Sequence, residues 1–126
     1  MTKSYRELKV WQLSIELSLT IYHLTVEFPK HELYGMTSQM RRAAVSIASN
    51  IAEGSARSTR KDFKQFVLIA KGSVCELQTQ LLIAGKLNYA ALDRFGLAER
   101  QCQDVAQMLS GLAKYLSVPV QPRRAS

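Results

Sequence analysis

The segment from Gln39 to Leu82 constrains the fold more than any other part of this 126-residue chain. On both sides of Gly54, apolar residues recur at the three- and four-residue spacing of a helix. The connection between the two patterns, Ser55 to Ser58, is short, and a short connection places two helices side by side in opposite directions. The segment therefore predicts an antiparallel helical pair, with Gly54 as the left-handed C-terminal cap of its first helix.

Two further helical patterns flank this pair. The first follows Ser4 and Glu7, which have the spacing of a capping box, and Pro29 ends it. The second follows a turn at Asn88 to Ala91 and is ended by Pro119. The chain thus contains four helical patterns joined by short connections.

This arrangement of patterns favours an all-α fold, because no segment shows the alternation of a strand. We expect an antiparallel up-down-up-down four-helix bundle over residues 1–118, followed by a short basic tail, residues 119–126, that is disordered. A domain of this size buries roughly two thirds of the surface of its unfolded chain. It needs no cofactor, metal or disulfide to fold.

The third helical pattern is long. Thr59 and Asp62 have the spacing of an N-cap, and the apolar stripe after them runs to about Leu87. Gly72 lies in the middle of this pattern, where a glycine costs about 1 kcal/mol relative to alanine. We expect Gly72 to lie against the backbone of another helix, which would offset this cost; a kink is the alternative.

Composition bears on the location of the protein. The chain has no apolar run near the ~20 residues that a membrane span needs, and its first residues carry charges of both signs, unlike a signal peptide. A cytoplasmic protein without membrane contact is the expectation. Cys75 and Cys102 have no second Cys or His at ligand spacing, so we interpret both as small buried thiols and expect no metal site.

The first helical pattern carries two apolar stripes. One comprises Leu8, Trp11, Ile15, Leu19, Tyr22 and Val26, and the other comprises Val10, Leu13, Leu17 and Leu24. This is more apolar surface than one bundle core needs, so part of it is expected to be buried between subunits of a homo-oligomer. Trp11 is the expected interface anchor, with stacking on a nucleic-acid base as the alternative.

The net charge is +7 and the isoelectric point is about 9.7. Between residues 41 and 71, only Glu53 and Asp62 oppose a group of basic residues. That group is either a solvated face or a surface that binds RNA or DNA phosphates, and it comprises Arg41, Arg42, Arg57, Arg60, Lys61, Lys64 and Lys71. Exposed aromatic residues are nearly absent beside the run, which predicts little base stacking and weak sequence preference. An acidic protein partner is the competing interpretation.

Glu53 and Glu76 lie on helical patterns that are expected to face each other. Paired carboxylates can perform acid-base catalysis or hold a metal, but di-iron bundles need Glu-x-x-His repeats. His23 and His31 lie in or just after the first helix and offer no such repeat. We therefore expect no catalytic residue, and structural pairing of both glutamates with Arg41, Arg42 or Asn50.

Several motifs resemble a bacterial family. They are Val10-Trp11-Gln12, Phe28-Pro29-Lys30, Gln39 to Ile47, Ser49 to Gly54 and Gly72 to Leu77. In this order they are similar to the four-helix-bundle family first noticed in intervening sequences of large-subunit ribosomal RNA genes. That family is similar in fold to the accessory variability proteins of diversity-generating retroelements, which form pentameric barrels and bind nucleic acid and a reverse transcriptase.

The resemblance implies a homo-oligomer, a pentamer by analogy, with no settled activity. Together with the charge pattern it leads to one hypothesis, a non-enzymatic scaffold that associates with nucleic acid as an accessory to a nucleic-acid-processing partner. The alternative is a protein–protein interaction module that binds no nucleic acid.

Overall fold

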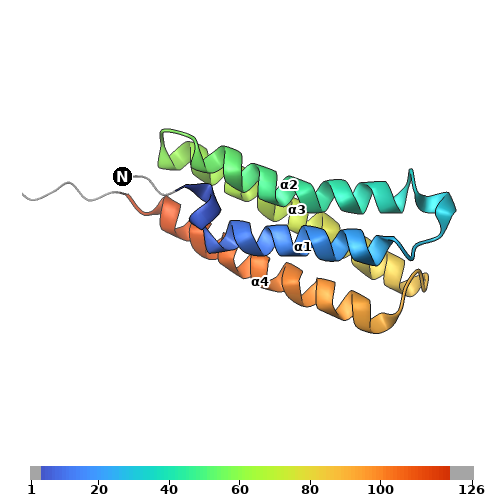
Figure 1. Cartoon of the computed structure of the whole chain (residues 1–126). Coiled ribbons are helices and arrows are strands. Elements are labelled where there is room, and N and C mark those ends of the chain that lie inside the picture. The colour runs from blue at the N-terminus through green and yellow to red at the C-terminus, as the bar shows by residue number, and fades with distance from the viewer. Residues whose placement is uncertain (1–3, 120–126) are drawn as a thin grey trace, which may run out of the picture.

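Four long helices form one antiparallel bundle in the computed structural model, which describes residues 4–119 (Figure 1). Each helix packs against its neighbours around the bundle, α1 on α2, α2 on α3, α3 on α4 and α4 on α1. The described residues include no strand, so the predicted all-α, up-down-up-down four-helix bundle is confirmed. The elements are η1 (Tyr5–Glu7), α1 (Lys9–Thr25), η2 (Lys30–Glu32), α2 (Met36–Ser55), α3 (Arg60–Lys86) and α4 (Leu92–Ser117).

The core runs along the axis of the bundle and receives side chains from all four helices. Its largest fully buried members include Leu17 and Ile21 of α1, Met40 and Ile51 of α2, Leu77 and Leu81 of α3, and Val105 and Leu109 of α4. Burying each such side chain stabilises the fold by about 1.5–3 kcal/mol. On α2 the small residues Ala43 and Ala44 are also buried, which lets neighbouring helices approach closely.

The first helix starts later than its capping pattern predicts. The hydroxyl of Ser4 accepts a hydrogen bond from the Arg6 amide at 3.2 Å, so it caps η1, a 3₁₀-helix, and not α1. The chain is extended at Leu8, and α1 begins at Lys9. The predicted capping box is therefore wrong for α1, although the pattern marks the start of ordered helical structure.

Gly54 is not a left-handed cap. No glycine in the described part of the chain has a positive φ, and Gly54 is buried inside the last turn of α2. A Cβ built on it would lie 2.6 Å from the Cβ of Phe66 on α3. The predicted role is wrong because this glycine serves a close approach between two helices.

The left-handed residue instead follows α3. Asn88 has φ 58°. Its amide donates to the Gly85 carbonyl at 3.1 Å, and the Tyr89 amide donates to the Ala84 carbonyl at 3.1 Å. These two bonds form a Schellman motif, in which asparagine supplies the left-handed conformation.

The beginning of α3 follows the sequence prediction. The Thr59 hydroxyl accepts a hydrogen bond from the Asp62 amide at 3.1 Å, and the helix runs for 27 residues. The predicted contact of Gly72 with another helix is wrong within the chain, because no heavy atom lies within 4 Å of the position of its Cβ. Gly72 lies on the outer face of α3, which points away from the bundle core.

By length and composition, α3 is apolar enough to cross a membrane, although 33% of its most apolar window is buried in the bundle. Two faces of the helix contribute to this composition. The inner face supplies core residues such as Val74 and Leu77, whereas the outer face carries exposed Leu68, Leu82 and Ile83. The core alone therefore does not account for the apolar character of α3.

At the end opposite the α2–α3 turn, Glu32 connects two loops. Its Oε1 accepts from the Met36 amide at 3.0 Å, which caps the start of α2, and its Oε2 accepts from the Tyr89 hydroxyl at 2.6 Å. The hydrogen bond from Tyr89 and the bond from Met36 lower the pKa of Glu32. The same contact with Glu32 raises the pKa of Tyr89. The Tyr89 ring packs on Phe28, with 5.3 Å between ring centroids.

Candidate nucleic-acid interface

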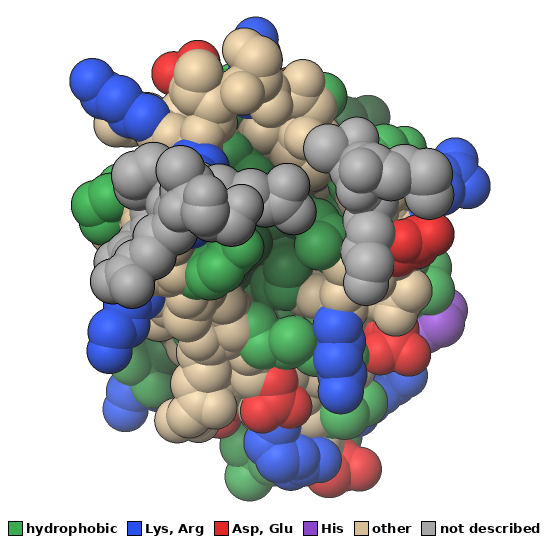
Figure 2. Space-filling view, turned by 90° about the vertical axis from the view of Figure 1, so that its left-hand side faces the viewer, with side chains coloured by type: hydrophobic (Ala, Val, Ile, Leu, Met, Phe, Trp, Pro, Cys, Tyr) green, Lys and Arg blue, Asp and Glu red, His purple; other side chains and the backbone are tan. Residues whose placement is uncertain are grey.

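One end of the bundle carries the whole charge surplus of the described chain. We call this the turn end, and it comprises residues 4–10, 53–64 and 111–119, where the α2–α3 turn, the start of α1 and the end of α4 meet (Figure 1). It holds seven basic and three acidic residues, whereas the rest of residues 4–119 holds seven of each. Figure 2 views the molecule from this side and shows Lys and Arg side chains at several points around its outline, with Asp and Glu side chains among them. The fold thus concentrates positive charge at one pole.

All three arginines of the turn end lie over aromatic rings, Arg6 over Tyr5 at 5.9 Å and the other two over rings of α3 and α4. The Arg60 guanidinium lies over the ring of Tyr115, 4.3 Å from the centroid, and its Nη2 donates to the Tyr115 carbonyl near the end of α4. The Arg57 guanidinium lies over the ring of Phe66 at 4.7 Å. Arg60 therefore holds the end of α4 against α3, in addition to any contact it makes with a phosphate.

Tyr115 also corrects the expectation that exposed aromatic residues are nearly absent beside the basic run. It lies 55 residues from Arg60 in sequence and is 61% exposed. Local sequence offered no signal for it, because only the antiparallel packing of α3 and α4 brings it to Arg60. An exposed ring beside positive charge is a surface on which an unpaired base can stack.

The lysines of the turn end are not neutralised by a described carboxylate. Among residues 4–119, the one ion pair joins Arg94 to Glu27, near the opposite end. Lys61 and Lys114 are exposed, and Lys64 is half-buried. Their ammonium groups remain available for an external anion.

The structure separates the basic residues that the sequence grouped together. Arg41 and Arg42 lie in the first turns of α2, and the twelve residues from Arg42 to Gly54 span about 18 Å at 1.5 Å per residue. The Arg41 Nε donates to the Thr25 hydroxyl at 2.9 Å, and its guanidinium lies 4.6 Å from the ring centroid of Tyr22. The predicted continuous patch is wrong in this respect, because the length of α2 keeps these arginines away from the turn end.

Lys71 lies between the two groups. It is half-buried, near the middle of α3, and seven residues beyond Lys64 on the same side of that helix. It extends the basic surface away from the turn end by about 10 Å.

The predicted pairing of Glu53 and Glu76 with Arg41, Arg42 or Asn50 is not found. Both side chains are exposed, and neither forms an ion pair within the described chain. Asn50 instead donates from Nδ2 to the Ser46 carbonyl at 2.8 Å and to the Ser46 hydroxyl at 3.0 Å. The Ser46 and Ser73 hydroxyls are 3.1 Å apart and join α2 to α3. Neutral hydrogen bonds thus occupy the place where the sequence suggested ion pairs.

Arg42 and Glu76 do line one feature together, an open polar groove of about 390 Å³ between α2 and α3. Its other lining residues are Gln39, Ala43, Ser46 and Ser73. In residues 4–119 no three His, Cys, Asp or Glu side chains gather as metal ligands would. The groove offers hydrogen-bonding groups and both signs of charge, but no arrangement that identifies a reaction.

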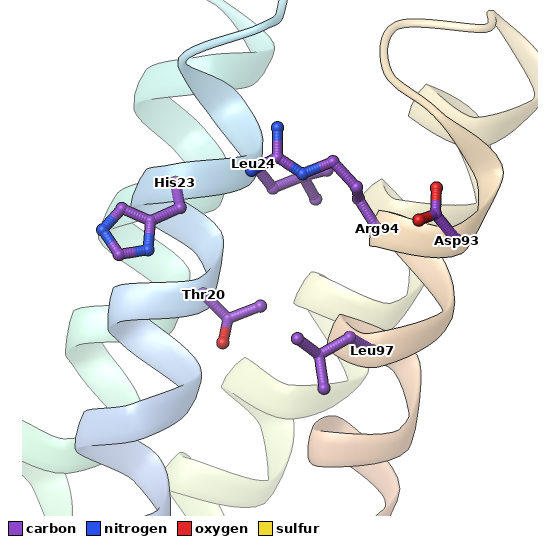
Figure 3. A pocket seen from close by; sticks show the side chains of 6 residues that line it. All are labelled: Thr20, His23, Leu24, Asp93, Arg94 and Leu97. Carbon is purple, nitrogen blue, oxygen red and sulfur yellow. The ribbon is translucent and has the colours of Figure 1, made fainter.

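A smaller hollow of about 230 Å³ lies between α1 and α4. Its volume is below the ~300–1,000 Å³ typical of ligand pockets. The imidazole of His23 points away from Arg94 and Asp93 across this hollow (Figure 3). The histidine and the carboxylate therefore do not form an acid-base pair there.

The two cysteines differ. Cys102 is buried as predicted, and burial raises the pKa of its thiol to about 12. Cys75 is exposed on the outer face of α3, so its predicted burial is wrong. Trp11, the predicted interface anchor, is half-buried, and its ring meets that of Tyr5 edge-on with 5.2 Å between centroids.

Comparison with known proteins assigns the family. A family model described as 23S rRNA-intervening sequence protein matches residues 6–111, which include nearly all of the bundle. The chain belongs to this family. The resemblance that the sequence motifs carried is thereby confirmed. The description of the family names no reaction, and a search of the curated proteins found no match.

The family assignment agrees with the fold of a solved structure. A crystal structure at 1.70 Å resolution shows a protein with unknown function from the S23 ribosomal protein family of Bacteroides thetaiotaomicron VPI-5482. It is 22% identical to this chain, with a TM-score of 0.75, over 83% of this chain and 98% of that one. At this level of identity the likeness shows the fold alone.

Proposed function

We propose that this protein is a non-enzymatic, cytoplasmic, homo-oligomeric scaffold that associates with nucleic acid through its turn end. The observation that supports the proposal is the charge distribution, because the turn end holds a surplus of four positive charges while the rest of residues 4–119 is balanced. A local surplus of this kind attracts a polyanion more strongly than the same charges spread evenly. The pentamer is what the family resemblance implies, and it would present the surface five times.

The side chains that carry this role are Lys61, Lys64 and Lys114, which no described carboxylate neutralises. Each lysine that contacts a phosphate releases counterions from the nucleic acid, so binding weakens steeply with salt. Tyr115 adds a ring for stacking, which favours single-stranded RNA or DNA over a duplex. Sequence preference is expected to be weak, because neither kind of contact reads base edges.

A second candidate is a protein–protein interaction module that binds an acidic protein partner and no nucleic acid. The same lysines would contact the carboxylates of that partner. The two candidates differ in what the purified protein retains. A nucleic-acid-binding scaffold copurifies with nucleic acid and therefore shows a high ratio of absorbance at 260 nm to that at 280 nm.

The test compares two triple variants by fluorescence anisotropy with labelled 20-nucleotide RNA and 20-base-pair DNA. The first replaces Lys61, Lys64 and Lys114 by alanine, and the matched control replaces Lys30, Lys86 and Arg100, which lie away from the turn end. We expect the first to bind more weakly and to flatten the slope of log K against log salt by roughly 2–3 on duplex DNA, at about 0.9 per lost phosphate contact. The control loses the same net charge and is expected to change the slope little.

Two results would count against the proposal. If the wild-type protein does not retain RNA or DNA at about 50 mM salt, the protein-partner candidate becomes the better account. If both triple variants lose affinity equally, binding depends on net charge and not on the turn end. Arg60 is left intact in both variants because its removal would free the end of α4.

A further inference from the structure

The bundle has an apolar groove on one side. It lies between α1 and α2, has a volume of about 340 Å³, and we call it the α1–α2 groove. Leu19 and Val45 line the groove, and their side chains are 55% and 42% exposed. Its floor and walls also include Trp11, Ile15, Ala48 and Ala52. The outer stripe of α1 that the sequence singled out therefore leads into a groove that the monomer leaves open.

A second apolar surface lies on the outer face of α3, and we call it the α3 ridge. Leu68, Ile69, Leu82 and Ile83 are 42%, 53%, 56% and 43% exposed. Gly72 and Cys75 lie between the two pairs and are also exposed, so small side chains leave the helix backbone accessible at the centre of the ridge. Large exposed apolar patches of this kind mark interaction sites.

The two surfaces are on different sides of the molecule. The α3 helix packs against α2 and α4 but not against α1, so it is diagonal to α1 in the bundle. Its outer face therefore points away from the groove. One partner molecule bound to one site would leave the other surface exposed to water.

Charged side chains border both surfaces. Glu16 and Glu53 are exposed and follow directly after Ile15 and Ala52 of the groove, so they lie along its rims. On α3, Lys71 lies three residues after Leu68 on one edge of the ridge, and the exposed Glu76 lies on the other edge, seven residues after Ile69 and seven before Ile83. Lys71 on the ridge complements Glu16 and Glu53 on the rims of the groove, so this edge of the ridge favours the groove of a second copy.

We infer that the α3 ridge of one copy docks in the α1–α2 groove of a second copy. Contact between two different surfaces is head-to-tail, and a head-to-tail contact that closes produces a ring. The inference rests on the homo-oligomer of the proposed function and deepens it by naming both faces. It also gives the exposed Gly72 a partner, because a helix without a side chain at this point can approach the groove closely.

Two double variants test the contact by their behaviour when mixed. L19E/V45E places carboxylates in the groove, and L68E/I83E places them on the ridge. All four positions are at least 42% exposed, so the fold is expected to tolerate the changes, and circular dichroism melts check this. Light scattering should show each variant alone as a monomer of about 14.2 kDa. A 1:1 mixture should form a heterodimer of twice that mass, because one intact groove and one intact ridge remain.

The control is L97E, which alters a 45% exposed leucine of α4 outside both surfaces and should assemble as the wild type does.

A disulfide test is independent of charge. S49C places a thiol in the groove, and an oxidant such as copper phenanthroline should join it to Cys75 of the next copy as a ladder on a non-reducing gel. Q103C, an exposed position of α4, should give no ladder.

Each outcome decides the matter. If the variants assemble as the wild type does, or if either variant alone remains a dimer, head-to-tail docking is overturned while the homo-oligomer stands. If the wild type is a monomer, both the contact and the homo-oligomer are overturned. If that monomer also sediments with lipid vesicles, the ridge is assigned to a membrane surface. Nucleic-acid retention is measured separately, so the fate of the turn end does not depend on these results.

Discussion

A single missing side chain lets α2 and α3 meet beside their connecting turn. A Cβ at Gly54 would lie 2.6 Å from the Phe66 Cβ and 2.9 Å from the Phe63 Cδ1, inside van der Waals contact. Neither atom is the end of a flexible chain, so the helices would have to move apart. We expect Gly54→Ala to lower the free energy of unfolding by about 1–3 kcal/mol, measured by urea denaturation.

Gly111 provides the matched control for Gly54. It also lies inside a helix, but no heavy atom lies within 4 Å of its Cβ position. Gly111→Ala should therefore stabilise the protein by up to about 1 kcal/mol, through helix propensity alone. Equal effects of the two substitutions would show that the close approach at Gly54 does not restrict the side chain.

Sequence alone could not separate these roles of glycine. A glycine at the end of a helical pattern, followed by a short link, is typical of a left-handed cap. Whether it instead permits close packing depends on where Phe66 lies, and that is set by how α2 and α3 align. The outward position of Gly72 could have been predicted, because Val67, Ala70, Val74 and Leu77 form the buried stripe of α3 and Gly72 lies on the opposite side of the helix.

At the scale of whole elements, the Glu32–Tyr89 hydrogen bond connects the α1–α2 corner to the α3–α4 turn. The bond lowers the pKa of Glu32 below its ordinary 4.5 and raises the pKa of Tyr89 above its ordinary 10.0. A depressed carboxyl pKa contributes stability that is present above pH 4.5 and lost as the pH falls through the lower, folded value. A raised tyrosine pKa contributes stability that is present below pH 10.0 and lost as the pH rises further.

Tyr89→Phe removes the bond and keeps the ring on Phe28. The stability difference between wild type and this variant should therefore be greatest between about pH 5 and pH 10, and should shrink in acid and in alkali. Thermal melts across this range measure it. A difference that does not change with pH would mean that the hydroxyl contributes through packing and not through the charged carboxylate.

Helices were more predictable than the contacts between them. The cap formed by Thr59 and Asp62 spans four residues, so the start of α3 could be read locally. The contact of Arg60 with Tyr115 joins residues 55 apart, and the cap of α2 comes from Glu32, which lies in the preceding corner and outside the helical pattern. Such contacts depend on the alignment and rotation of helices, which periodicity leaves open.

At the scale of the whole molecule, charge is polarised along the bundle axis. A polyanion that binds the folded turn end, and not the unfolded chain, stabilises the protein by mass action, by about 2.7 kcal/mol at 100 times its Kd. For a domain of this size we expect the thermal midpoint to rise by roughly 10 °C. Differential scanning fluorimetry with a 20-nucleotide RNA at low salt measures the shift.

Salt provides the control for this shift. At about 1 M salt the Debye length falls to ~3 Å, so the stabilisation should vanish. A midpoint that does not respond to RNA at low salt, or a shift that survives high salt, would contradict electrostatic binding at the turn end.

The fold class was predictable because four periodic segments and short links leave few alternatives. The basic surface was predictable in part. Lys61 and Lys64 belong to the turn end by their place after the α2–α3 link, but Lys114 joins them only because α4 returns to the same pole. Arg41 and Arg42 are close to this group in sequence and far from it in space, because they lie in the first turns of α2 and most of that helix separates them from the α2–α3 turn.

The chain enters and leaves the bundle at the same pole, since Ser4 and Pro119 both lie at the turn end (Figure 1). An affinity tag or fluorescent protein fused to either terminus is therefore tethered beside the lysines, where it can mask them in a binding assay. The opposite pole has a better attachment point at Tyr34, which is 93% exposed in the corner between η2 and α2. A circular permutant that links the start of α1 to the end of α4 and opens the chain at this corner would carry its fusion partner at the far pole and leave the basic surface uncovered.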